Sequence, residues 1–154
     1  MEVILLPKFE ELAREFEFLA QLVEMIGDNP FKARAYRFAA AKMRERGGED
    51  VTEDAISRLS KEKGVGKAIV EKSRQFLHTG RIEKIEELKS QIPLPLFYLA
   101  KKPSIPGREL HRLYCDLKEL PPGEIVAVLK EQATELGLEN DFFALLEEKI
   151  SSSN

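Results

Sequence analysis

The sequence predicts an all-α protein, a helical bundle in which a glycine hairpin joins two of the helices. Apolar residues recur every three or four positions through most of the chain, which is the spacing of amphipathic helices. The turn Gly64-Val65-Gly66 separates two such stretches, and glycine or proline separates the others. With 154 residues, of which 43% are apolar, the chain is long enough to bury a core.

Two helices are expected before the glycine hairpin, over residues 7–26 and 31–46. Pro7 is tolerated in the first turn of the first helix, and Gly27 ends that helix. Asp28-Asn29-Pro30 then restarts the chain, because Asp or Asn caps a helix and Pro is favoured at the first helical position. The second helix carries six basic residues against one acidic residue, so we expect a cationic surface there.

The hairpin unit itself is expected over residues 52–79. Its first helix is short and begins after Thr52, which is suited to the N-cap position. Its second helix ends at Gly80, since glycine favours the left-handed position that closes a helix. A further helix is expected over residues 81–89, and it ends before Pro93.

The last part of the chain is expected to hold helices over residues 123–136 and 140–150, followed by a Ser-rich tail. These helices are acidic and show no pattern typical of a catalytic site. The net charge of −3 conceals a basic middle and acidic ends. A protein that coats nucleic acid indiscriminately is therefore excluded, whereas a localised basic site is not.

Cysteine, histidine and the first residues restrict the remaining classes. One cysteine and two histidines exclude a disulfide framework and a structural zinc site, and they favour a reducing compartment. The apolar start Val3-Ile4-Leu5-Leu6 is too short for a signal peptide or a membrane span. We therefore expect a cytoplasmic protein with no membrane partner and no bound metal.

Two stretches have patterns typical of phosphate binding. The turn Gly64-Val65-Gly66 leaves backbone N–H groups and the start of the next helix open to an anion. The basic helix places Lys32 and Tyr36 on one line, and a basic stripe beside an aromatic ring suits a nucleic-acid backbone with its bases or sugars. The alternatives are a plain connection between helices and an ordinary solvated cationic face.

Three linked segments resemble the N-terminal lyase domain of family X DNA polymerases, which include DNA polymerase beta and the bacterial polymerase X proteins. The segments are residues 29–40, 64–72 and 79–85, and their order and spacing agree over roughly residues 8–92. The resemblance implies a compact helical domain that binds gapped or single-stranded DNA through a helix-hairpin-helix. In several members the domain also removes a 5′-deoxyribose phosphate by β-elimination through a lysine Schiff base.

The same resemblance implies roles for five residues. Lys72 falls on the family's Schiff-base lysine, whereas Lys32, Tyr36, Glu71 and Lys84 fall on positions that hold the 5′-phosphate or position and tune the nucleophile. A Schiff-base lysine must be deprotonated, and Lys72 lies at the edge of an apolar stripe, where burial and nearby cations lower a lysine pKa. The alternative is a lysine whose stem covers the core while its ammonium group reaches water.

The chain departs from the family pattern in and before the hairpin. Glu62-Lys63 replaces an aliphatic residue followed by a small residue or proline, which weakens the apolar anchor of the turn. It also weakens a monovalent cation site on the hairpin backbone, the one cofactor that the resemblance allows. Phe31 stands in place of a histidine and Ala68 in place of a phosphate-binding lysine, so Lys67 takes over that contact only if the helix rotation permits it.

Full-length family members carry a second helix-hairpin-helix, and residues 94–120 keep its helices. The turn here reads Pro103-Ser104-Ile105-Pro106-Gly107-Arg108 without Gly-x-Gly, so we expect a degenerate second unit. We also expect no polymerase domain, because no strand-rich segment and no Asp-x-Asp pair for two catalytic metals is present. We expect two domains, a helix-hairpin-helix domain over residues 1–92 and a helical extension over residues 93–154.

Our first hypothesis is a DNA-binding protein of DNA repair that recognises gapped, nicked or single-stranded DNA through backbone phosphates. The expected DNA contacts are Lys32, Arg34, Arg37, Gly64, Val65, Gly66, Lys67 and Lys84. The first alternative is a stand-alone 5′-deoxyribose phosphate lyase with Lys72 as nucleophile and Glu71, Tyr36 and Lys84 around it. The second alternative is a non-catalytic adaptor whose acidic C-terminal helices dock on a separate polymerase or other repair protein.

Overall fold

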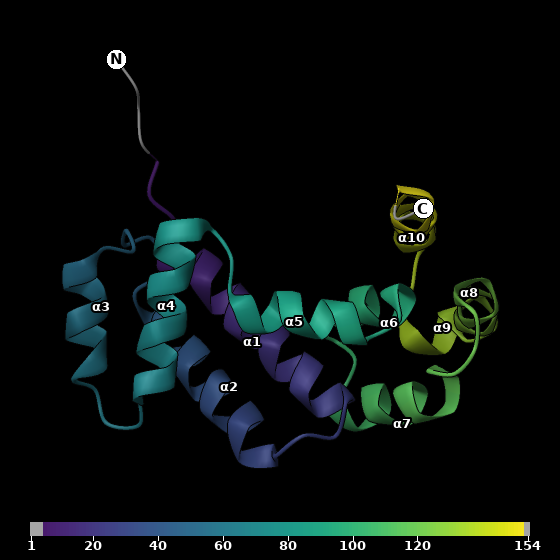
Figure 1. Cartoon of the computed structure of the whole chain (residues 1–154), viewed down its shortest axis with the longest axis horizontal. Helices are drawn as coiled ribbons and strands as arrows, with labels where there is room; N and C mark the ends of the chain where they lie inside the picture. The colour runs from purple at the N-terminus through teal and green to yellow at the C-terminus, as the bar shows by residue number, and fades with distance from the viewer. Residues whose placement is uncertain (1–4, 153–154) are drawn as a thin grey trace.

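The structure is a computed structural model that describes residues 5–152 (Figure 1). The apolar pair Val3-Ile4 and the end of the Ser-rich tail lie outside the described residues. The described chain forms ten helices and no strand apart from one isolated bridge between Lys8 and Asp50, so the all-α prediction is confirmed. The helices are α1 Phe9–Met25, α2 Pro30–Glu45, α3 Glu53–Ser60, α4 Lys67–Thr79, α5 Glu83–Gln91, α6 Leu94–Leu99, α7 Gly107–Leu117, α8 Pro122–Glu131, α9 Ala133–Leu136 and α10 Asn140–Ser152.

Helix α1 is the central element of the fold. It packs against α2, α5 and α7, which lie around it in Figure 1. Its apolar residues recur at three- and four-residue spacing and are fully buried, among them Phe9, Leu12, Phe16 and Leu19. Helices α3 and α4 form one end of the molecule, and α8 to α10 form the other.

Local sequence signals determine where α2 and α3 begin and where α4 ends. The Asn29 side chain accepts a hydrogen bond of 2.9 Å from the Phe31 N–H, and Pro30 occupies the first position of α2. The Thr52 hydroxyl accepts a hydrogen bond of 3.1 Å from the Ala55 N–H at the start of α3. Gly80 closes α4 with φ of 76°. The predicted caps Asn29, Thr52 and Gly80 are therefore confirmed, whereas Pro7 precedes α1, which begins at Phe9 after the N-cap Lys8.

The prediction of one helix over residues 123–136 is wrong. Helix α8 ends at Glu131, and the short α9 follows after Gln132, whose φ of −101° and ψ of 12° lie outside the helical range. The interruption redirects the chain, so that Leu136 and Leu138 both reach the core. Helix α10 also continues beyond the predicted end at residue 150 as far as Ser152, whose hydroxyl donates a hydrogen bond of 2.7 Å to the Glu148 carbonyl.

Apolar side chains from both halves of the chain join one core, which runs from Phe9 in α1 to Leu146 in α10. Contacts between α1 and α7 connect the two parts. The division into residues 1–92 and 93–154 stays a prediction. No described helix combines the length and the apolar character needed to cross a lipid bilayer.

Candidate nucleic-acid interface

The turn between α3 and α4 presents backbone groups to solvent. Val65 points into the core with 8% of its surface exposed, and its N–H donates a hydrogen bond of 3.2 Å to the Glu62 carbonyl. Gly66 occupies the N-cap position of α4, and no side chain caps this helix. The first N–H groups of a helix have no partner within the helix, so the exposed start of α4 is a site where an anion can bind.

Gly64 allows this turn to pack closely against α2. Its φ of +93° lies in the left-handed region, which glycine adopts without strain. A Cβ atom at this position would lie 2.7 Å from Cε1 of Phe38, which is closer than two carbon atoms that are not bonded to each other can approach. The Phe38 ring therefore lies directly against the backbone of the hairpin.

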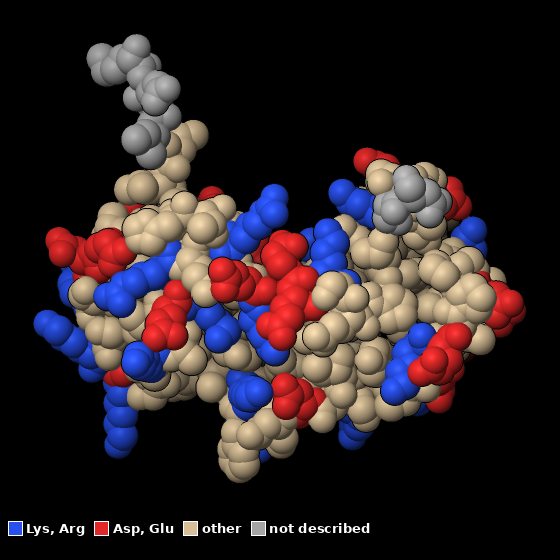
Figure 2. Space-filling view, in the orientation of Figure 1, with Lys and Arg blue, Asp and Glu red and all other residues tan. Residues whose placement is uncertain are grey.

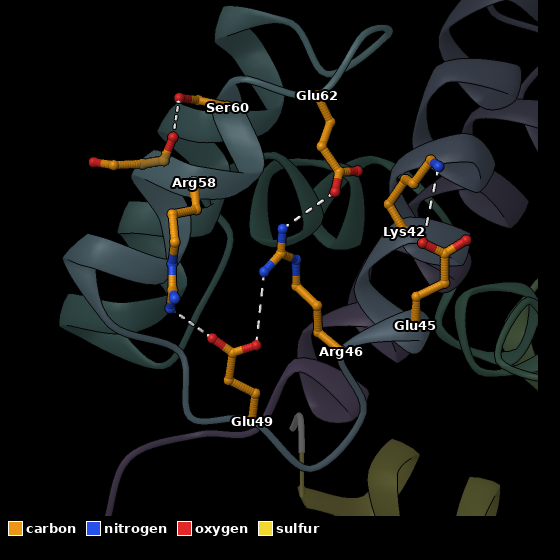
Figure 3. Close-up of polar contacts among 8 residues, drawn as sticks. Lys42, Glu45, Arg46, Glu49, Arg58, Ser60 and Glu62 are labelled. Atoms are coloured by element: carbon orange, nitrogen blue, oxygen red, sulfur yellow. Dashed lines mark hydrogen bonds and ion pairs between the residues drawn. The ribbon is translucent and has the colours of Figure 1, made fainter.

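An ion-pair network attaches the hairpin to the end of α2 (Figure 3). The Arg46 guanidinium donates a hydrogen bond of 3.2 Å to the Glu62 carboxylate and lies 3.6 Å from Glu49. Arg58 of α3 donates to the same Glu49 over 2.7 Å. Arg46 also lies over the Phe9 ring, 5.9 Å from its centroid. Glu62, which sequence reasoning treated as a weak point of the hairpin, thus forms a polar anchor in place of the expected apolar one.

A second cluster surrounds Lys72 at the contact between α2 and α4. The Lys72 ammonium lies over the buried Tyr36 ring, with Nζ 5.7 Å from the ring centroid. Partial burial lowers the pKa of Lys72, and the charges of Lys84 and Lys32 lower it further, against an opposing effect of Glu71. Burial also raises the pKa of Tyr36, which stays protonated. Lys32, Tyr36 and Lys84 thus lie around Lys72, together with Glu71, its neighbour in sequence.

The cations around Lys72 have acidic partners of their own. Lys32 Nζ lies 3.3 Å from Asp28, and the Asn29 backbone N–H together with Lys32 lowers the pKa of that carboxyl group. Lys84 is partly buried and lies 3.7 Å from Glu87. Both lysines beside Lys72 are therefore paired with a carboxylate. Such surroundings suit a phosphate, which can replace these carboxylates as the negatively charged partner of the two lysines.

The remaining predicted residues lie in different places. Lys67 projects from the start of α4 with 90% of its side chain exposed and lies 4.0 Å from Glu71. Arg34 is exposed on the outer face of α2. Arg37 faces the other way, where it pairs with Glu24 and donates a hydrogen bond of 2.9 Å to Gln21. Arg37 therefore does not join the Lys72 cluster.

The second hairpin shares one turn hydrogen bond and one buried residue with the first, although Ser104, in the position of Gly64, does not have a positive φ. The Ile105 N–H donates to the Lys102 carbonyl over 3.2 Å, as Val65 does to Glu62, and Ile105 is buried as Val65 is. Pro106 then occupies the N-cap position of α7, as Gly66 does in α4. The helix–turn–helix geometry persists without the glycines because the buried residue and its hydrogen bond define the turn.

The start of α7 differs from that of α4 because it carries a carboxylate from the protein itself. The Glu24 side chain lies against Gly107, in the space that a Cβ atom would occupy. The Gln21 amide donates to the carbonyls of Lys102 and Ile105 over 2.9 and 3.2 Å. Sequence reasoning missed both residues, although a glutamine on the apolar face of α1 was a signal that a buried polar contact exists there.

The surface charge is mixed rather than uniformly basic. Figure 2 shows Lys and Arg side chains over α2, α4 and α5 interspersed with Asp and Glu. This face therefore offers no continuous basic surface, because acidic and basic side chains lie side by side on it.

Comparison with known proteins agrees with this geometry. A family of helix-hairpin-helix domains matches residues 7–82, which include both helices of the first hairpin. Over 108 residues the chain is 29% identical to DNA polymerase/3′-5′ exonuclease PolX from Bacillus subtilis (strain 168). The matched region is 70% of this chain but 18% of that relative, so the chain spans less than a fifth of the length of the curated relative.

The resemblance to bacterial polymerase X proteins that the sequence predicted is thus confirmed. It extends past the first hairpin, since the matched segment is longer than residues 7–82. Residues 7–82 are thus similar to helix-hairpin-helix domains, and the chain is similar over 108 residues to part of a polymerase X protein.

Proposed function

We propose that this protein binds gapped, nicked or single-stranded DNA in DNA repair, with a backbone phosphate held at residues 64–67. The observation that carries the proposal is the exposed start of α4 behind Gly66, which has no side-chain cap. Backbone N–H groups recognise a phosphate without reading the base attached to it. Recognition therefore depends on the shape and the ends of the DNA, not on base sequence.

Three cations support the phosphate contact. Lys67 lies at the hairpin, whereas Lys32 and Lys84 lie beside Lys72. Arg37 has no part in the proposed contact, because Glu24 and Gln21 already hold it. Each phosphate that a cation neutralises releases counterions, so affinity must fall steeply as salt rises.

A glycine substitution tests the hairpin without disturbing the fold. Gly66 has φ of −85°, and a Cβ atom there would meet nothing within 4 Å. Gly66→Ala therefore folds normally but places a methyl group beside the anion site. We expect affinity for 5′-phosphorylated gapped DNA, measured by fluorescence anisotropy, to fall about tenfold, the loss of one hydrogen bond to a charged group.

Gly123→Ala is the matched control. Gly123 lies in the first turn of α8, away from the hairpin, and a Cβ atom there also has open space. Equal affinities for the Gly66 and Gly123 variants would contradict the proposed phosphate site. A wild-type protein that binds no DNA, or whose affinity hardly changes with salt, would contradict DNA binding itself.

The Lys72 cluster favours a second function, cleavage of 5′-deoxyribose phosphate ends. In this reaction the neutral Lys72 amine attacks the aldehyde carbon C1′ of the opened sugar, and water leaves as the imine forms. A base then removes a proton from C2′, and the C3′–O bond breaks to release the phosphate end of the DNA. The lowered pKa of Lys72 and the cations that flank it support this proposal.

Borohydride trapping on DNA with an incised abasic site tests the lyase. We expect a covalent adduct with wild type and none with Lys72→Arg, which keeps the charge but cannot form the imine. Lys118→Ala is the control, because Lys118 also lies over a tyrosine ring, 5.3 Å from that of Tyr114. An adduct that persists in Lys72→Arg would exclude Lys72 as the nucleophile. If wild type binds the DNA but forms no adduct, the lyase is excluded and DNA binding is the function that remains.

The adaptor alternative requires an apolar surface on the C-terminal helices. Among the described residues from 123 onward, Leu145 is the one large apolar side chain classed as exposed, at 38%. A single leucine is a small docking surface compared with stable protein interfaces. The described surface therefore favours DNA over a protein as the main partner.

A further inference from the structure

Helix α2 exposes two phenylalanine rings on the face opposite the core. Phe31 is 67% exposed and Phe38 is 41% exposed, whereas the other seven phenylalanines are buried or partly buried. The two rings are seven residues apart, which places them on the same side of the helix. Two exposed rings on one face of a helix differ from apolar residues scattered singly over a surface, so this face is a candidate binding surface.

Cations accompany both rings. The Arg34 guanidinium lies 5.1 Å from the centroid of Phe31, and Lys42 Nζ lies 5.6 Å from that of Phe38. The acid on this side is Glu45, 3.8 Å from Lys42 (Figure 3). A flat apolar ring beside a positive charge is complementary to a nucleotide, which offers a flat base and an anionic phosphate.

The hairpin connects this surface to the proposed phosphate site. Phe38 packs directly on Gly64, two residues before the N-cap of α4. A strand with one phosphate at the start of α4 therefore has a neighbouring base within reach of the Phe38 ring. Phe31 lies about 10 Å further along α2, at 1.5 Å per residue, which is about three nucleotide steps of a stacked strand.

We propose that Phe38 and Phe31 form a stacking platform for unpaired nucleobases of a single strand that leaves the hairpin along α2. This inference rests on the proposed function and specifies its ligand, since bases in a duplex are already stacked and are not available to the rings. The platform selects strands with unpaired bases next to the bound phosphate. An apolar protein partner is the competing occupant, and the mixed charge and flat rings favour the nucleic acid.

Leucine substitutions separate stacking from apolar contact. Phe31→Leu and Phe38→Leu keep apolar side chains, and Leu retains cover over Gly64, but they remove the flat rings. We expect each to weaken binding to a single-stranded or gapped oligonucleotide about 5- to 150-fold, the range for one stacked base. Blunt duplex binding and the salt slope should stay unchanged, because the phosphate contacts remain.

Two further measurements make the result specific. A 2-aminopurine placed one nucleotide from the 5′-phosphate should change its fluorescence on binding to wild type and not to Phe38→Leu. An oligonucleotide that lacks the bases but keeps the phosphates should bind wild type and the variants equally. Leu145→Ala, which alters an exposed apolar side chain on α10, is the control and should bind as wild type does.

The outcomes distinguish failure of the platform from failure of the proposed function. If wild type binds DNA with a steep salt dependence but the leucine variants bind as tightly, the platform is wrong and the phosphate site stands. Equal loss on duplex and single strand would also overturn the platform, because it would indicate a distorted hairpin. Absence of any DNA binding by wild type would overturn both.

Discussion

The ammonium group of Lys72 lies over the ring of Tyr36, 5.7 Å from its centroid, although the two residues are far apart in sequence. This contact joins α2 to α4 and places Lys72 at the edge of the core. The ring shields the amine from water on one side, and Lys84 and Lys32 act on it electrostatically. Binding of phosphate and a reactive amine are therefore possible at one position.

Reactivity of Lys72 should depend on pH in a way that its neighbours control. Burial is the main cause that holds the folded-state pKa of Lys72 below its ordinary value, and the charge of Lys84 is the second. The neutral amine therefore forms at lower pH than in free lysine. Trapping by borohydride should rise with pH through this lowered pKa. Lys84→Met removes one cause, raises the pKa and should move the profile to higher pH, with a rate near neutrality about two- to tenfold lower.

This experiment requires saturating DNA in single turnovers, because Lys84 is also a proposed phosphate contact. Lys118→Met is the control with a lysine–tyrosine pair outside the site. A profile for Lys84→Met that coincides with wild type would show that Lys84 does not tune the amine.

The hairpin glycines should differ sharply in their tolerance of a side chain. Gly64→Ala meets both an unfavourable φ of +93° and the Phe38 ring, whereas Gly66→Ala meets neither. We expect Gly64→Ala to lower the free energy of unfolding by about 1–3 kcal/mol and Gly66→Ala by less than about 1 kcal/mol. Urea unfolding followed by circular dichroism measures both, and equal losses would contradict the close packing of Phe38 on the turn.

Glu24 should stabilise the second hairpin. Its carboxylate lies at the start of α7 against Gly107 and pairs with Arg37, so it interacts favourably with the helix dipole and with a cation. Glu24→Ala should lower the free energy of unfolding by about 1–2 kcal/mol. Glu10→Ala, which removes an exposed pair with Arg14, should cost about 0.5 kcal/mol or less. The prediction fails if the two variants unfold at the same urea concentration.

The helices were predictable because they depend on local sequence order, whereas the grouping of Lys32, Tyr36 and Lys84 around Lys72 was expected from the resemblance to family X polymerases. Helical spacing placed Lys32 and Tyr36 on one line and Lys72 at the edge of an apolar stripe, and the fold joins these faces. Thr52 and Asn29 cap their helices through hydrogen bonds to residues three and two positions away, so a short stretch of sequence is enough to predict these caps.

Contacts between charged residues far apart in the chain were not predictable in this way. Arg37 and Lys32 lie on the same basic helix, but only the packing of α1 shows that Arg37 faces Glu24 while Lys32 faces the Lys72 side. Periodicity separates apolar from polar faces and does not tell which polar face meets another helix. The roles of Glu62 and Gln21 were missed for the same reason.

The pair of Arg46 and Glu62 gives a direct test of the polar anchor of the hairpin. Arg46 is 20% exposed and Glu62 is 32% exposed, so removing one partner deprives the other, partly buried charge of its nearest counter-charge. Glu62→Leu alone should therefore destabilise the protein, although Arg46 keeps its weaker contact with Glu49. The double variant Arg46→Met with Glu62→Leu replaces the ion pair with an apolar contact and should recover much of the loss. In a double-mutant cycle by urea unfolding, we expect a coupling of about 1–3 kcal/mol. Additive single effects would mean that the hairpin holds its position through Val65 and Phe38 and not through this ion pair.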